Sequence, residues 1–218
     1  MFHWKYRILL KTQLENNFDT GIQFLESKNQ KFKKLLASVG YFSYSSRELS
    51  FESLVKIIIN QQLSNNVASK IFNKLKSNLT SSKNVTPQEI LKLEESNFLN
   101  SGISKSKMGF IRNIAKEINM NPNLLQGWKC LKDEKAFFEI TKFKGFGPWS
   151  ANIILLSCLG RQDILPYNDA TIQKAVLNLF GFNLNKNNSA KLNWAKPYRS
   201  ILCMYLWRWV DGGMKNIS

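Results

Sequence analysis

The chain has 218 residues with 44% hydrophobic content, which is enough for one large domain or two small lobes and excludes a disordered chain. With only 11 glycines and 5 prolines, turn residues are too few for an all-β protein, so an α-rich fold is expected. The formal net charge of +16 favours a polyanionic partner, either nucleic acid or an anionic membrane surface, although a solvated basic surface gives the same number.

Apolar residues recur at helical spacing from residue 22 onward, and no convincing series of strands or internal repeat is present. The first twenty residues are ambiguous and fit either short strands or a segment wrapped round the core. The predicted helices cover, in chain order, approximately residues 22–39, 51–61, 65–78, 86–93, 105–119, 133–141, 148–158, 169–180, a short stretch from 189, and 197–210. The fold class is therefore expected to be nearly all α.

Start and stop signals support these helices. A proline is expected at the start of the helices from Pro148 and Pro197, and Gly181 ends the helix before it. The residues expected to cap or open helices are Ser64, Thr86, Ser104, Asp133, Asn168 or Asp169, and Ser189.

The stretch from Lys142 to Trp149, KFKGFGPW, joins two predicted helices through a tight turn. Gly145 and Gly147 can adopt positive φ, and the phenylalanine between them can point into the core. The following helix presents free N–H groups, which bind phosphate, and Lys142 and Lys144 add positive charge beside them. A phosphate clamp and an ordinary corner between helices explain this stretch equally well when it is taken alone.

Residues 143–152 resemble the hairpin of the helix–hairpin–helix (HhH-GPD) superfamily of base-excision DNA glycosylases. In that superfamily a loop containing Gly and Pro follows the hairpin and leads to an aspartate, which here is Asp169. Three further stretches resemble, in the same order, the 3-methyladenine DNA glycosylase II branch: 57–64, then 102–104 with Lys107, and 194–200 with 205–208. Together the matches cover roughly residues 50 to 210, and four ordered matches are more specific than one glycine pair.

The resemblance implies a bilobal bundle of about ten short helices with a helix–hairpin–helix motif. It implies that residues 1–218 form a single glycosylase unit of two helical lobes, with the hairpin and catalytic loop at 142–169. The N-terminal segment 1–48 lies outside the resemblance, and its structure stays open.

Asp169 matches the catalytic aspartate of the family, because a carboxylate beneath the sugar stabilises oxocarbenium charge when an N-glycosidic bond is cleaved. Without the resemblance Asp169 would be taken as a helix N-cap, and Asp163 is the fallback carboxylate. Trp149 and Trp207 match positions that line the base pocket, where a cationic base gains from π faces. Core packing is the alternative for Trp207, and Ile153 stands where the family can have an aromatic residue.

Gln62 matches the family's wedge, the side chain that fills the gap left by a flipped base, and Leu63 is the neighbouring candidate. The other interpretation is that Gln61 and Gln62 only cap a helix end. The residues expected to bind the DNA backbone are Lys142, Lys144, Gly145, Gly147 and Ser150. Further cations that could contact phosphates, support loops or simply be solvated are Lys105, Lys107, Arg199 and Arg208.

Superfamily members that also cut the strand carry a lysine shortly after the second hairpin glycine, where it forms a Schiff base. Trp149 occupies that position here. The resemblance therefore implies a monofunctional DNA glycosylase that removes alkylated purines, of the 3-methyladenine and 7-methylguanine type, by base flipping and leaves an abasic site. The alternatives are a non-catalytic helix–hairpin–helix protein that binds DNA structure, and a glycosylase for mismatched or oxidised bases.

Three cysteines without a CxxC pair and one histidine are too few for a structural zinc or iron–sulfur site. The resemblance allows a monovalent cation at the hairpin carbonyls and implies no other cofactor. We expect a monomer that acts on double-stranded DNA with damaged bases and has no membrane partner. No apolar run has the length of a membrane span and no secretory signal is recognised, so the expected location is intracellular: cytoplasm or nucleoid in a prokaryote, nucleus in a eukaryote.

Overall fold

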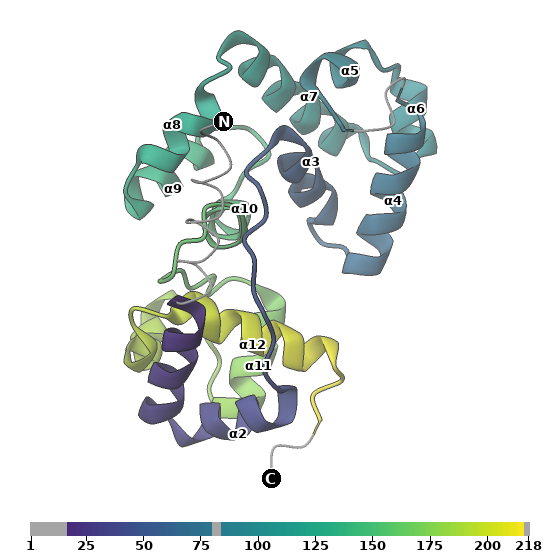
Figure 1. Cartoon of the computed structure of the whole chain (residues 1–218). Coiled ribbons are helices and arrows are strands. Elements are labelled where there is room, and N and C mark those ends of the chain that lie inside the picture. The colour runs from purple at the N-terminus through teal and green to yellow at the C-terminus, as the bar shows by residue number, and fades with distance from the viewer. Residues whose placement is uncertain (1–16, 80–83, 216–218) are drawn as a thin grey trace, which may run out of the picture. The chain divides into compact units, whose positions relative to one another are not determined.

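The computed structural model describes residues 17–79 and 84–215, and within these ranges every regular element is a helix (Figure 1). The prediction of a mainly α fold is confirmed. The chain divides into two compact units: one is Arg47–Leu159, and the other combines the N-terminal segment up to Ser46 with Gly160–Ser218. No described helix combines the length and the apolar character that crossing a membrane requires.

The unit Arg47–Leu159 is built round α3, whose side chains Leu54, Ile58 and Ile59 are almost fully buried. Its helices are α3 (Phe51–Asn60), α4 (Asn65–Ser77), α5 (Pro87–Lys92), α6 (Glu95–Asn100), α7 (Lys105–Met120), α8 (Leu124–Cys130), α9 (Asp133–Thr141) and α10 (Pro148–Ile153), which a π-helical turn, η1 (Ile154–Cys158), continues. Helix α3 packs against α4, α7 and α10, so the break after α3 and the hairpin before α10 belong to one packed assembly.

The second unit joins the N-terminal residues to the C-terminal ones. Its described helices are one over residues 17–28, α2 (Gln30–Val39), α11 (Ala170–Phe180), the 3-10 helix η2 (Lys186–Ala195) and α12 (Arg199–Asp211). Tyr205 of α12 lies between Phe32 and Phe42, with ring centroids 5.3 Å and 4.8 Å away. The Lys31 ammonium donates to the Leu179 carbonyl at the end of α11, at 2.9 Å. Residues 17–46 are therefore part of the core that supports α11 and α12 (Figure 1).

Most predicted helix boundaries are confirmed by their capping bonds. The hydroxyls of Ser64, Thr86 and Ser104 accept from the backbone N–H three residues on, at 3.4, 3.3 and 3.4 Å respectively. Gly181 ends α11 in the left-handed conformation, with φ +80°. The rhythm over 22–39 corresponds to two helices, because the Asn29 side chain accepts from Lys31 N and Phe32 N and starts α2 anew.

Three predicted helix starts are wrong. Asp133 is the first residue of α9, and its N-cap is Lys132. The helix expected from Ser189 begins at Lys186, because Asn185 forms a capping box ahead of it. The last helix begins at Arg199 instead of Pro197, because the Tyr198 N–H donates to Ala195 O at 2.7 Å and closes a separate turn. The prediction for the first twenty residues lies largely outside the described residues.

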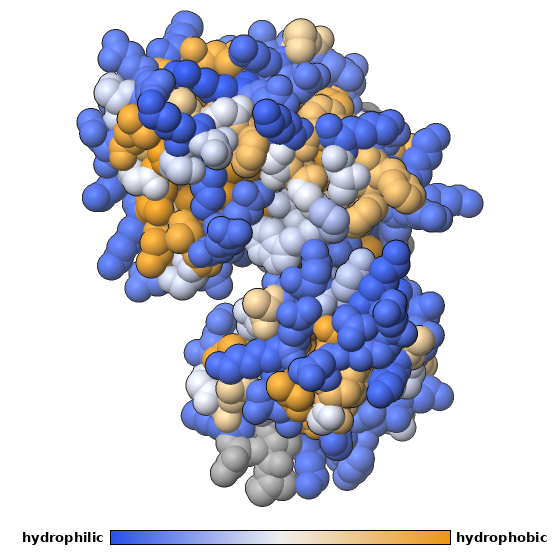
Figure 2. Space-filling model, turned by 180° about the vertical axis from the view of Figure 1, so that it is seen from behind, coloured by the Kyte–Doolittle hydropathy of each residue, from blue (hydrophilic) through white to orange (hydrophobic). Residues whose placement is uncertain are grey.

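The face in Figure 2 is mainly hydrophilic on each unit, with apolar patches among the hydrophilic side chains. The large apolar side chains that are exposed on the described surface are Tyr41, Leu63, Val67, Leu99, Met120, Phe138 and Leu177.

Candidate functional site

The hairpin between α9 and α10 depends on Gly145. This residue has φ +100°, and a Cβ there would lie 2.4 Å from Cγ of Phe110 on α7. Phe146 is 2% exposed and points into the core, as predicted. Gly147 does not use its capacity for positive φ: its φ is −78°, and a Cβ there would meet nothing within 4 Å. The tight turn therefore requires only the first glycine.

Gln61, directly after α3, ties the break in the chain to this hairpin. Its Nε2 donates to Gly145 O at 2.7 Å and to Ser150 Oγ at 3.0 Å. Ser150 is 2% exposed, so its hydroxyl supports the hairpin from inside. The predicted contact of Ser150 with a DNA backbone stays a prediction. The link between Gln61 and the hairpin was not predicted, because its two partners lie 84 and 89 residues further along the chain than Gln61.

The turn after α3 is held by Lys107 of α7. The Lys107 ammonium donates to Ile59 O and Gln61 O, both at 2.8 Å, and so satisfies carbonyls that lack a partner at the end of a helix. Burial lowers the pKa of Lys107 from its ordinary value. Gln62, the predicted wedge, is exposed at φ +59°, and Leu63 beside it is 36% exposed. Of the three interpretations offered for Lys107, loop support is the one that its bonds fit.

The lysines of the hairpin lie on the surface. Lys142 pairs with Glu139 at 2.7 Å while its side chain stays 66% exposed, and Lys144 is exposed. Trp149 and Ile153, both on α10, are partly exposed and four residues apart, a spacing that places them on one side of the helix. These positions agree with the predicted surface roles without testing them.

Asp169 is the N-cap of α11 in the unit that includes Gly160–Ser218. The side chain is 7% exposed. Its Oδ1 accepts from Ile172 N at 2.9 Å and from the Trp207 indole Nε1 at 3.1 Å. Trp207 is partly exposed, whereas Trp209 is buried and donates to Lys215 O at 2.9 Å. Core packing therefore describes Trp209, and Trp207 lies directly beside the carboxylate.

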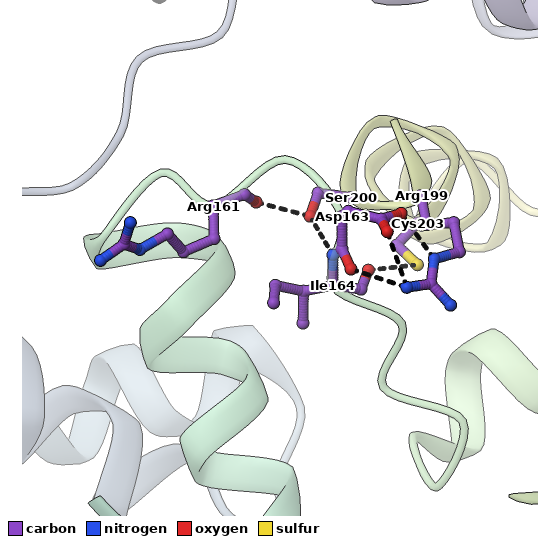
Figure 3. Close-up of polar contacts among 6 residues, drawn as sticks. All are labelled: Arg161, Asp163, Ile164, Arg199, Ser200 and Cys203. Carbon is purple, nitrogen blue, oxygen red and sulfur yellow. Dashed lines mark hydrogen bonds and ion pairs between the residues drawn. The ribbon is translucent and has the colours of Figure 1, made fainter. Parts of the chain in front are cut away.

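The loop that leads to Asp169 is fixed by the start of α12 (Figure 3). The Ser200 hydroxyl donates to Arg161 O at 2.6 Å and accepts from Ile164 N at 3.0 Å. Arg199 binds both carboxylate oxygens of Asp163, at 2.6 and 2.9 Å. Asp163 is thus engaged in holding the loop, and the fallback catalytic role does not fit it. The resemblance includes Ser200 in one of its stretches but assigns it no role, and its partners lie 36 and 39 residues away.

The three cysteines are free thiols. Cys203 is buried beside the loop, 3.9 Å from Ile164 O, and burial together with the charge of Asp169 raises its thiol pKa (Figure 3). Burial likewise raises the pKa of Cys158. Within residues 17–79 and 84–215 no cluster of three or more His, Cys, Asp or Glu side chains could hold a metal ion.

Residues 55–196 match the family described as HhH-GPD superfamily base excision DNA repair protein. "DNA-3-methyladenine glycosylase 1" of Schizosaccharomyces pombe is 25% identical over 193 residues, which cover 84% of this chain and 84% of that protein. The "Alkylbase DNA glycosidase-like protein mag2" of the same yeast is 24% identical over 201 residues, which cover 89% of this chain and 94% of that protein.

Solved structures share the fold. The S. pombe 3-methyladenine DNA glycosylase, in complex with abasic DNA, matches with a TM-score of 0.78 at 24% identity over 88% of this chain and 97% of that chain. The 3-methyladenine DNA-glycosylase of Archaeoglobus fulgidus matches with a TM-score of 0.74 at 23% identity over 96% of this chain and 76% of that chain.

Proposed function

The chain belongs to the HhH-GPD superfamily of base excision DNA repair proteins, and from this premise we propose that it is a monofunctional DNA glycosylase for alkylated purines in duplex DNA. The observation that carries the proposal is the Asp169 carboxylate, which Ile172 N–H and the Trp207 indole hold at the start of α11. The names of the S. pombe relatives, a 3-methyladenine glycosylase and an alkylbase glycosidase-like protein, support the substrate class.

In the proposed reaction, the bond between C1′ of the sugar and the purine nitrogen breaks, and its electron pair leaves with the base. An alkylated purine is already cationic, so it departs as a neutral base without a general acid. The sugar is left with oxocarbenium character, which the negative charge of Asp169 stabilises. Asp169 orients a water molecule, which adds to C1′ and releases one proton to the solvent.

The base must leave the stack to reach this carboxylate. Gln62 is the proposed side chain that replaces it in the duplex, and its exposed position on a turn at φ +59° supports that role over Leu63. Trp149 and Trp207 are the proposed aromatic surfaces for the flipped base, since a cationic ring gains from π faces. Ile153, one turn after Trp149, is the further proposed lining residue.

The hairpin is the proposed contact with the DNA backbone. Lys142 and Lys144 supply positive charge on the surface. The free space over Gly147, where a Cβ would meet nothing within 4 Å, leaves the start of α10 open to a phosphate. Double-stranded DNA with a damaged base is thus the proposed partner, bound by a monomer inside the cell.

A monovalent cation held by hairpin carbonyls is proposed on the family resemblance. Gly145 O accepts from Gln61 at 2.7 Å and Phe143 O accepts from Phe146 N at 3.0 Å. A carbonyl oxygen has two lone pairs, so these bonds are compatible with a cation ligand at either residue. A bound cation would offset the negative charge of the nearby phosphate.

The test is base release from methylated duplex DNA, with chromatography of the freed bases. We expect 3-methyladenine or 7-methylguanine from the native protein. Strand breaks should appear only after alkali, because Trp149 stands where strand-cutting members have lysine, and borohydride should trap no covalent adduct. Good DNA binding without base release would favour a non-catalytic DNA-binding protein. Release of oxidised or mismatched bases alone would favour a glycosylase for those bases.

A further inference from the structure

The turn that carries Gln62 binds the Lys107 ammonium through its carbonyls and is joined to the hairpin by the Gln61 side-chain amide. We propose that Lys107 and Gln61 form a brace that fixes this turn to the hairpin, and that the brace lets Gln62 enter the base stack at the lesion. Lys107 and Gln61 are then positioning residues for base flipping. The inference rests on the proposed function, because it names how that function's wedge is held.

The turn has an uncommon backbone conformation. Gln62 has φ +59°, which is uncommon for a residue with a side chain and persists only where the surrounding structure holds it. Lys107 supplies the hold, because its ammonium donates to the carbonyls of Ile59 and Gln61 at 2.8 Å each. The second of these carbonyls belongs to the peptide bond that leads into Gln62.

The Gln61 side chain joins the turn to the hairpin. The Gln61 amide donates to Gly145 O at 2.7 Å on one side of the hairpin and to Ser150 Oγ at 3.0 Å on the other. Ser150 is buried, so this anchor has little freedom to move. Gln62 is the next residue, so its backbone position follows that of Gln61. A hairpin that grips the DNA backbone thereby sets where the Gln62 side chain meets the stack.

Lys107 differs from a lysine that serves as a surface charge. Its ammonium is directed at two carbonyls, and burial lowers its pKa. Lys116, nine residues further along α7, is exposed. Replacing Lys116 removes the same charge from the same helix without touching the turn, which makes it a matched control.

The experiment uses the full chain and a duplex with a stable abasic-site analogue opposite 2-aminopurine, whose fluorescence rises when it is unstacked. The native protein should raise the fluorescence at saturation, and Gln62→Ala should lose most of that rise. Lys107→Met and Gln61→Met should lose it as well while DNA affinity changes little. Lys116→Met should behave as native, and Lys107→Arg, which keeps donors near the two carbonyls, should recover much of the rise.

Single-turnover base release from methylated duplex DNA is measured on the same variants. Misplacement of the wedge should slow it by about 10- to 100-fold in Lys107→Met and Gln61→Met. Absence of base release by the native protein, with the fluorescence pattern intact, would overturn the proposed enzyme and leave the brace standing.

The brace is overturned if Lys107→Met and Gln61→Met keep the native fluorescence rise, or if native protein and Gln62→Ala respond alike. Thermal melting is recorded for every variant. A fluorescence loss that appears only in variants that have also lost their melting transition, with no rescue by Lys107→Arg, would indicate a purely structural role and contradict the proposal.

Discussion

The two glycines of the hairpin differ in what they do. Gly145 has a backbone conformation and a neighbour, Phe110, that both exclude a side chain. Gly147 has an ordinary φ of −78° and open space where a Cβ would be. The fold of the unit therefore requires a glycine at Gly145, and the proposed phosphate contact accounts for the glycine at Gly147.

Alanine substitutions separate these two roles. Gly145→Ala should lower the free energy of unfolding by about 2 to 4 kcal/mol, because it adds left-handed strain and a clash with Phe110. Gly147→Ala should stay within about 0.5 kcal/mol of the native value and yet weaken duplex DNA binding severalfold. Thermal melting and fluorescence anisotropy measure the two effects, and native DNA affinity in Gly147→Ala would exclude the phosphate contact.

Glu52 of α3 makes stability depend on pH. Burial acts to raise the pKa of its carboxyl, but the bonds from Lys56 and from Val85 N–H, at 2.6 and 3.1 Å, and the charges of Lys56 and Lys76 together lower it below 4.5. The folded state then binds this proton less readily than the unfolded state. The contribution of Glu52 to the free energy of unfolding is fully present above the pKa of the unfolded state, and it is lost as the pH falls through the lower pKa of the folded state.

Glu52→Gln removes that titration. We expect native protein to be more stable than Glu52→Gln near neutral pH, and the difference to shrink as the pH falls below about 4.5. Urea unfolding followed by circular dichroism over a pH series measures the difference. A difference that stays constant down to the acid limit would show that Glu52 has an ordinary pKa in the folded protein.

At the scale of elements, α12 organises the loop that precedes Asp169. Ser200 and Arg199 at its start bind the loop, and Trp207 reaches the carboxylate two turns later. Such long-range polar bonds have no periodic signature, so the sequence could not indicate them. The capped helices α4, α5 and α7 were predictable because Ser64, Thr86 and Ser104 stand directly ahead of apolar periodicity.

The two helices that were not predicted, α6 and α8, lack these signals. Neither has a side-chain cap, and each has six or seven residues with one buried side chain, Phe98 or Trp128. Helices this short depend on tertiary packing more than on their own propensity. The start of η2 was misplaced because Asn185 competes with Ser189 as a cap and makes the stronger set of bonds.

Ser200→Ala tests the support of the loop. It leaves Ile164 N–H and Arg161 O without the hydroxyl that joins them, so unfolding free energy should fall by about 1 to 3 kcal/mol. Base release should also slow, because the loop positions Asp169. Ser189→Ala, which removes only a local bond to Lys186 O, is the control and should be near native by urea unfolding. Equal behaviour of both variants would contradict the assigned role.

At the scale of the whole molecule, the chain folds as two units, and the one with Asp169 takes its core from both ends of the chain. Phe32 on α2 is fully buried against Tyr205 on α12. The N-terminal part of this core could not be predicted from the resemblance, which covers the C-terminal helices but leaves residues 1–48 outside. The resemblance did identify Asp169 and the hairpin, whereas the bond from Gln61 to Gly145 spans 84 residues and needed the structure.

Phe32→Ala should therefore loosen one unit selectively. We expect a loss of about 3 to 5 kcal/mol from that unit, because a large buried ring is removed. Cys203, which is buried there, should become reactive to a thiol reagent, while Cys158 in the other unit stays protected. Cys130 is exposed and should react in both proteins. Mass spectrometry of labelled peptides follows the three sites, and equal exposure of Cys158 and Cys203 would argue against independent units.

The most direct measurement is single-turnover base release by Asp169→Asn on methylated duplex DNA, with binding measured in parallel. Asparagine is an equally good N-cap and its carbonyl can still accept from Ile172 N–H and Trp207, so the fold should be retained. Release should fall about 100-fold or more, with DNA affinity unchanged or higher, because a negative charge is removed. Asp211→Asn, an exposed site on α12, should act as native. Base release by Asp169→Asn at the native rate would contradict Asp169 as the catalytic carboxylate.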